Sequence, residues 1–152
     1  MTVSLGDALK VFEKLWPTQL AEDWDVVGLV TGSLSQPIKK VLLTVDVTSD
    51  VVEHAKDVGA DLIFAHHPML LRGVTSISED TSKGLVLAEL VRANIAVYSA
   101  HTNADSIRHV HGVSHHHPVK ELVFQKEGPR HRVIADQEAH PRSEEHTSEL
   151  QS

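Results

Sequence analysis

The sequence predicts an α/β fold in which a mostly parallel sheet carries helices on its faces. Three short runs of aliphatic and β-branched residues, at 41–47, 61–65 and 95–100, are typical of buried strands. Segments with apolar residues at helical spacing lie between them, at 48–60 and 81–94. Strands and helices that alternate at this spacing favour right-handed crossovers and parallel strands.

A further helix is predicted over residues 5–16, ahead of the first long strand. Its apolar side chains recur three or four positions apart, Ser4 can cap its start, and Pro17 lies just past its end. A short apolar run between glycines, VVGLVTG, follows. The next helix, within 48–60, has cap candidates in its first residues and ends at Gly59. The candidates for that cap are Ser49 and Asp50.

Composition narrows the classes of protein that the sequence allows. A chain of 152 residues fits one domain. It has no cysteine, which excludes disulfides, a cysteine nucleophile and thiolate metal sites. The net charge of -7 disfavours a nucleic-acid partner. We expect a cytoplasmic protein with no membrane partner, because no apolar run approaches about 18 residues. The 12 histidines are the unusual feature, since neutral imidazole is a common metal ligand.

Metal-ligand residue types follow each of the three strands. Asp46 lies at the end of the first, His66 and His67 follow the second, and His101 with Asp105 follows the third. Ligands of parallel sheets bind beyond the carboxyl ends of the strands, so these side chains should meet at one edge. Consecutive histidines leaving a strand are expected to point apart. Two ions about 3.5–4 Å apart, each taking one histidine, would fit that arrangement.

Other interpretations of these residues stay open. A histidine pair is often no more than a surface feature, and Asp46 can simply cap the following turn. Asp25, in the EDWD loop, is a weaker candidate still, and Trp24 is expected to serve packing. The histidine tract at 115–117 can bind metal adventitiously, but its consecutive positions cannot all converge with the strand-end residues.

Four segments, DWDVVGLVTG, VLLTVDVT, DLIFAHHPMLLRG and IAVYSAHTNAD, resemble the GTP cyclohydrolase I type 2 homologs, the Nif-three-like family. The resemblance covers roughly residues 1–114. It implies a cytoplasmic α/β protein that holds two divalent cations per subunit, with Zn, Mn and Fe as candidates, and assembles as a homohexamer. It also implies metal ligands at His66, His67 and Asp105, with His101 beside them. Asp46, at the end of the first strand, is a further candidate beside the site.

The remainder of the chain departs from that family. Its members are longer and complete the site with a C-terminal His and Glu, for which His140 and Glu144 have the spacing but not the flanking residues. Residues 115–141 stay unassigned, with two apolar runs compatible with a weak hairpin. Residues 142–152 resemble the translation of a common sequencing-library adapter. We therefore expect a tail with few contacts to the core, an open sheet edge, and a chain that by itself is inactive and forms no defined hexamer.

Two functions are compatible with these residues. The first is a metal-dependent hydrolase acting on a small molecule that the sequence does not identify, because two ions can activate a bridging water and clamp an oxyanion. The alternative is a non-enzymatic metal-handling or regulatory interaction protein, since the sequence contains no substrate-pocket motif.

Overall fold

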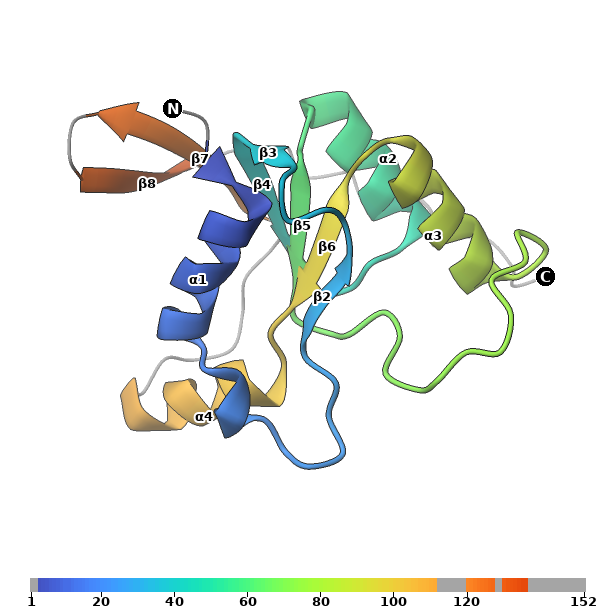
Figure 1. The fold of residues 1–152 in the computed structure, drawn as a ribbon, viewed down its shortest axis with the longest axis horizontal. Coiled ribbons are helices and arrows are strands. Elements are labelled where there is room, and N and C mark those ends of the chain that lie inside the picture. The colour runs from blue at the N-terminus through green and yellow to red at the C-terminus, as the bar shows by residue number, and fades with distance from the viewer. Residues whose placement is uncertain (1–2, 112–119, 128–129, 137–152) are drawn as a thin grey trace, which may run out of the picture.

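The computed structural model describes residues 3–111, 120–127 and 130–136, and side chains up to residue 107. A central sheet is covered by helices on both faces (Figure 1). The strands are β1 (Val3–Ser4), β2 (Gly28–Thr31), β3 (Pro37–Ile38), β4 (Lys40–Thr44), β5 (Leu62–Ala65), β6 (Ala96–Ser99), β7 (Lys120–Glu127) and β8 (Arg130–Asp136). The helices are α1 (Leu5–Leu15), α2 (Ser49–Val58), α3 (Ser82–Arg92) and α4 (Thr102–His111), with a 3-10 turn at Thr18–Leu20.

The large sheet has the strand order β2-β6-β5-β4-β7-β8. Its central strands β4, β5 and β6 are parallel, which confirms the predicted α/β class with a parallel sheet core. The outer strands are antiparallel to their neighbours: β2 to β6 on one side, and β7 to β4 and β8 to β7 on the other. A separate pair, β1 with β3, lies beside the start of α1.

Local signals place the helix ends. The Ser4 hydroxyl accepts a hydrogen bond from the backbone N–H of Asp7 at 3.1 Å, so Ser4 caps α1 as predicted. Thr48 caps α2, because its hydroxyl accepts a hydrogen bond from the N–H of Val51. The two predicted candidates for this cap, Ser49 and Asp50, are therefore wrong. Gly59 ends α2 in the left-handed conformation at φ 67°, as expected for a helix-terminating glycine.

The side chains of the parallel strands alternate between two hydrophobic layers. One face packs against α2 and α3, and its strand residues include Leu42, Ile63 and Val97. The opposite face packs against α1, and its strand residues include Val41, Leu62 and Tyr98. Because successive side chains of a strand point to opposite faces, buried runs such as LIFA supply both layers at once. Figure 1 shows α1 on one side of the sheet and α2 with α3 on the other.

The segment after residue 113 contributes more to the sheet than the sequence predicted. Its two apolar runs lie in β7 and β8, which form a hairpin, and β7 pairs with β4 from Lys40↔Val123 to Leu43↔Lys120. We expected an open sheet edge and a tail with few contacts to the core. Both expectations are wrong for β7, because this strand of the tail pairs with β4 of the core sheet. The expectations for residues 115–117 and 142–152 fall outside the described residues. No helix in the described part of the chain is long and apolar enough to cross a membrane.

Candidate metal centre

The register of the parallel strands brings the predicted residues to one edge. Thr44 of β4 is the partner of Ala65 in β5, and Ala65 is the partner of Ser99 in β6. The chain segments that follow these positions therefore leave the sheet side by side. The backbone N–H of His66 donates to the carbonyl of Thr44 at 3.0 Å, and that of His67 donates to Val45 at 2.8 Å. These bonds hold the histidine pair against the end of β4.

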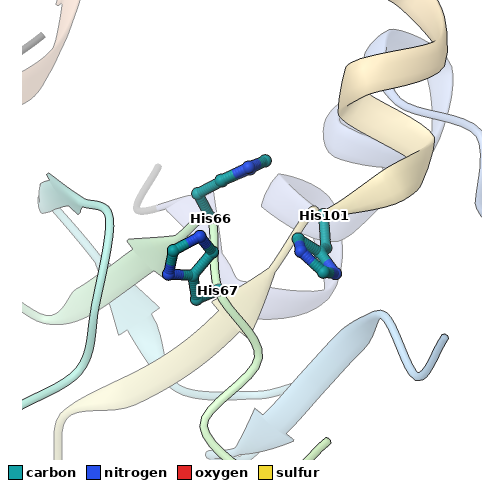
Figure 2. Close-up of side chains that lie close together, drawn as sticks. All are labelled: His66, His67 and His101. Atoms are coloured by element: carbon teal, nitrogen blue, oxygen red, sulfur yellow. The ribbon is translucent and has the colours of Figure 1, made fainter. Parts of the chain in front are cut away.

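Three histidines meet at this edge. His66 and His67 come from the end of β5, and His101 comes from the end of β6 (Figure 2). One ligand nitrogen from each ring lies within 4.8 Å of the others. The prediction that His66 and His67 point apart is wrong, because the regular strand ends at Ala65 and the pleat that would separate them ends with it. Both histidines can therefore approach the same ion.

Each of the three rings has an oxygen acceptor beside its Nδ1 atom. The three contacts are His66 to the carbonyl oxygen of Ala100 at 3.1 Å, His67 to Oδ1 of Asp46 at 2.8 Å, and His101 to Oδ1 of Asp25 at 3.2 Å. An acceptor at Nδ1 favours the neutral tautomer that carries its hydrogen there, which leaves the lone pair on Nε2. Metal-binding histidines in proteins are commonly oriented in this way. The donor chemistry of the cluster thus fits a transition-metal ion.

The predicted carboxylates take two different positions. Asp105, in the first turn of α4, has its Oδ2 atom 3.8 Å from Nε2 of His66, so it faces the ligand side of that ring. Asp46 contacts Nδ1 of His67, where its Oδ1 atom accepts the ring hydrogen. The assignment of His66, His67 and Asp105 as the ligands stays a prediction. His101, expected beside the ligands, is a member of the cluster itself.

Asp25 is the site residue that sequence reasoning underrated. Its side chain is fully buried, and its Oδ2 atom accepts hydrogen bonds from the backbone N–H of Thr102 at 3.1 Å and from the Thr102 hydroxyl at 2.5 Å. Burial raises the pKa of Asp25, but the hydrogen bonds from Thr102 and His101 outweigh it and hold that pKa below its ordinary value. The only sequence signal was an Asp close before the strand that pairs with β6.

A cavity of about 420 Å³ adjoins the cluster on the side of His67. It lies between the starts of α2 and α3, and its lining includes Asp46, Thr48, Ser82 and Lys83. The Lys83 ammonium donates to the carbonyl oxygen of Met69 at 2.7 Å, which keeps this cation at the cavity wall. A small polar molecule can therefore lie next to the face of the cluster that His67 forms.

The fold and the site together define an α/β protein whose central parallel strands deliver a histidine cluster to one sheet edge. A sequence profile of Duf34/NIF3 (NGG1p interacting factor 3) matches residues 3–134. The chain belongs to the Duf34/NIF3 family, which confirms the resemblance that its motifs indicated. The match extends past residue 114, into the segment that the motifs left unassigned.

Individual relatives support this family assignment. The "GTP cyclohydrolase 1 type 2 homolog" of Streptomyces coelicolor is 42% identical over 102 residues, which cover 67% of this chain and 36% of that protein. The protein of the same name from Clostridium perfringens is 41% identical over 106 residues, or 70% of this chain and 40% of that protein. The crystal structure of a Bacillus cereus protein related to NIF3 has a TM-score of 0.66 and 36% identity, over 68% of this chain and 29% of that one. The chain thus spans well under half the length of these relatives.

Proposed function

We propose that this chain binds a divalent transition-metal ion, such as Zn²⁺, Mn²⁺ or Fe²⁺, at the cluster of His66, His67 and His101. The observation that supports this proposal best is the shared arrangement of the three rings. Each places Nδ1 against an oxygen acceptor, and the ligand nitrogens lie within 4.8 Å of one another. Imidazole nitrogen suits several transition metals, so the donor set alone does not select one of them.

The described part of the chain contains candidate ligands for one ion. Three imidazoles and one carboxylate, that of Asp105, would make up the four donors of a tetrahedral centre. A second ion would need further ligands, and a two-metal site generally uses bridging carboxylates. We therefore propose one ion per chain here, with a second site completed in the longer relatives.

Metal binding can be measured directly on the full 152-residue chain. After treatment with a chelator, titration calorimetry and elemental analysis with Zn²⁺ and Mn²⁺ should give about one bound ion per chain. His66→Gln and His67→Gln should weaken binding at least about tenfold, since changes to partners of metal ligands alone cost about 10–100-fold. His54→Gln is the matched control, because His54 lies exposed on α2 away from the cluster. Equal affinity in all four proteins would contradict the proposal.

We propose hydrolysis as the chemistry of the complete protein, with the cavity beside His67 as the place for its substrate. A divalent ion at the cluster would polarise a substrate oxygen and lower the pKa of a bound water. The residues of this chain would do the rest of the positioning: Asp46 orients the His67 ring, and the 420 Å³ cavity admits a small substrate next to it. We propose phosphate esters and cyclic amides as the substrate classes to test.

A substrate screen separates hydrolysis from the alternative, a non-enzymatic metal-handling or regulatory role. The assay uses a full-length relative, such as the Streptomyces coelicolor protein, with each candidate metal in turn. We expect turnover that requires metal and that is lost when the histidine matching His67 is changed to Gln. Stoichiometric metal binding without turnover on the whole panel would favour the metal-handling role instead.

A further inference from the structure

Asp25 connects two segments that are far apart in the sequence. It lies in the loop ahead of β2, and its hydrogen-bond partners His101 and Thr102 stand 76 and 77 residues later, where β6 leads into α4. The antiparallel pairing Gly28↔Ser99 brings the two segments together. A second bond joins the same segments, because the N–H of Glu22 donates to the Thr102 hydroxyl at 3.0 Å.

The two carboxylate oxygens of Asp25 accept hydrogen bonds from different residues. Oδ2 takes both donors of Thr102, and Oδ1 faces Nδ1 of His101. The Thr102 hydroxyl already accepts from Glu22, so its own hydrogen is directed to Asp25. A fully buried carboxylate held by two donors on one oxygen cannot rotate without losing them. Its other oxygen is therefore a fixed acceptor for His101.

We propose that Asp25 is a positioning residue that fixes His101 in the tautomer with its hydrogen on Nδ1, so that the Nε2 lone pair is available to the histidine cluster. The tautomer follows from these hydrogen bonds alone. Its consequence for metal affinity rests on the proposed metal-binding function. Trp24, next to Asp25, contacts the His101 ring edge-to-face with centroids 6.0 Å apart and limits rotation of that ring.

Asp25→Asn is the informative variant because it keeps the shape and removes one acceptor. The backbone N–H of Thr102 can only donate a hydrogen bond. The single carbonyl oxygen of the new amide should therefore turn toward Thr102 to accept it. The amide NH₂ then faces Nδ1 of His101, which must accept, and the ring hydrogen moves to Nε2. Asp23→Asn is the matched control, since Asp23 lies exposed in the same loop and its change alters the net charge equally.

The tautomer can be read from ¹⁵N chemical shifts of the imidazoles in the metal-free full chain, at a pH of about 8, above the ordinary histidine pKa. A His101→Gln spectrum assigns the signal. We expect the Nδ1–H form in the wild type and in Asp23→Asn, and the Nε2–H form in Asp25→Asn. The Nε2–H form in the wild type would overturn the inference even if Asp25→Asn fails to fold, and so would an unchanged tautomer in Asp25→Asn.

Calorimetry with Zn²⁺ supplies the second readout. Asp25→Asn should bind Zn²⁺ about 10–100-fold more weakly than Asp23→Asn, the usual effect of losing a partner of a metal-ligating histidine. Thr102→Ser, which keeps both donors to Asp25, should retain wild-type affinity. Equal affinity in Asp25→Asn and Asp23→Asn would overturn the inference. A wild-type chain that binds no Zn²⁺ would overturn the proposed metal function, while the ¹⁵N spectra would still decide the role of Asp25.

Discussion

The Nε2 atom of His66 lies 3.8 Å from the Oδ2 atom of Asp105. This separation is too long for a hydrogen bond. It is compatible with two ligands of one ion, because donors bound at about 2.0–2.1 Å lie at most about 4.2 Å apart. His66 follows the end of β5, and Asp105 lies in the first turn of α4. The Asp105 carboxylate would therefore complete the ligand set from the side of α4.

We therefore expect Asp105→Asn to weaken Zn²⁺ binding at least about tenfold, by analogy with the 10–100-fold effects of partners that only orient metal ligands. Asp57→Asn removes the same charge from an exposed position on α2 and should leave the affinity unchanged. Titration calorimetry on both variants measures the difference. If the two variants bind Zn²⁺ equally well, Asp105 is not a ligand.

Gly84 should be intolerant of any side chain. A Cβ atom at this position would lie 2.0 Å from the carbonyl oxygen of Ser78, a backbone atom that cannot move away cheaply. Alanine normally stabilises a helix relative to glycine by about 1 kcal/mol, but overpacking of this kind costs about 1–3 kcal/mol. Gly84→Ala should therefore lower the free energy of unfolding in urea. Gly73→Ala, whose Cβ would meet nothing within 4 Å, should stay within about 0.5 kcal/mol of the wild type.

The single tyrosine of the chain offers a test of pH dependence. Burial raises the pKa of Tyr98, and the nearby Glu13 carboxylate raises it further. The folded state therefore keeps the phenol proton at a pH where the unfolded chain loses it, so this contribution to stability is lost as pH rises above about 10. Tyrosinate absorbance should appear at higher pH in the folded chain than in the same chain in urea. Coincident titration curves would contradict the burial of Tyr98.

Removal of residues 114–152 should expose the edge of β4. In the folded chain β7 covers this edge, and unpaired edges of sheets promote association. We expect the shortened chain to associate with increasing concentration in sedimentation experiments. Removal of residues 137–152 alone keeps β7 and β8 and should behave like the full chain. A shortened chain of 113 residues that stays monodisperse would show that β7 is dispensable.

Much of the fold was predictable because its signals are local. The parallel strands are continuous apolar runs, their helices have helical spacing, and Ser4 and Gly59 mark helix ends by their own chemistry. The hairpin of β7 and β8 was not predictable to the same degree. Its apolar runs are short and interrupted by charged residues. The neighbour that stabilises such a strand is β4, which lies about 80 residues earlier in the chain.

The pattern of strands in the sequence is enough to predict that His66, His67, His101 and Asp105 gather at one edge, because parallel strands end on the same side. The directions in which these side chains face depend on the folded structure. The rings of His66 and His67 converge because the regular strand stops at Ala65. Asp25 reaches His101, which stands 76 residues later in the sequence, because β2 pairs with β6, and a contact made by such distant segments leaves no periodic or spacing signal along the chain.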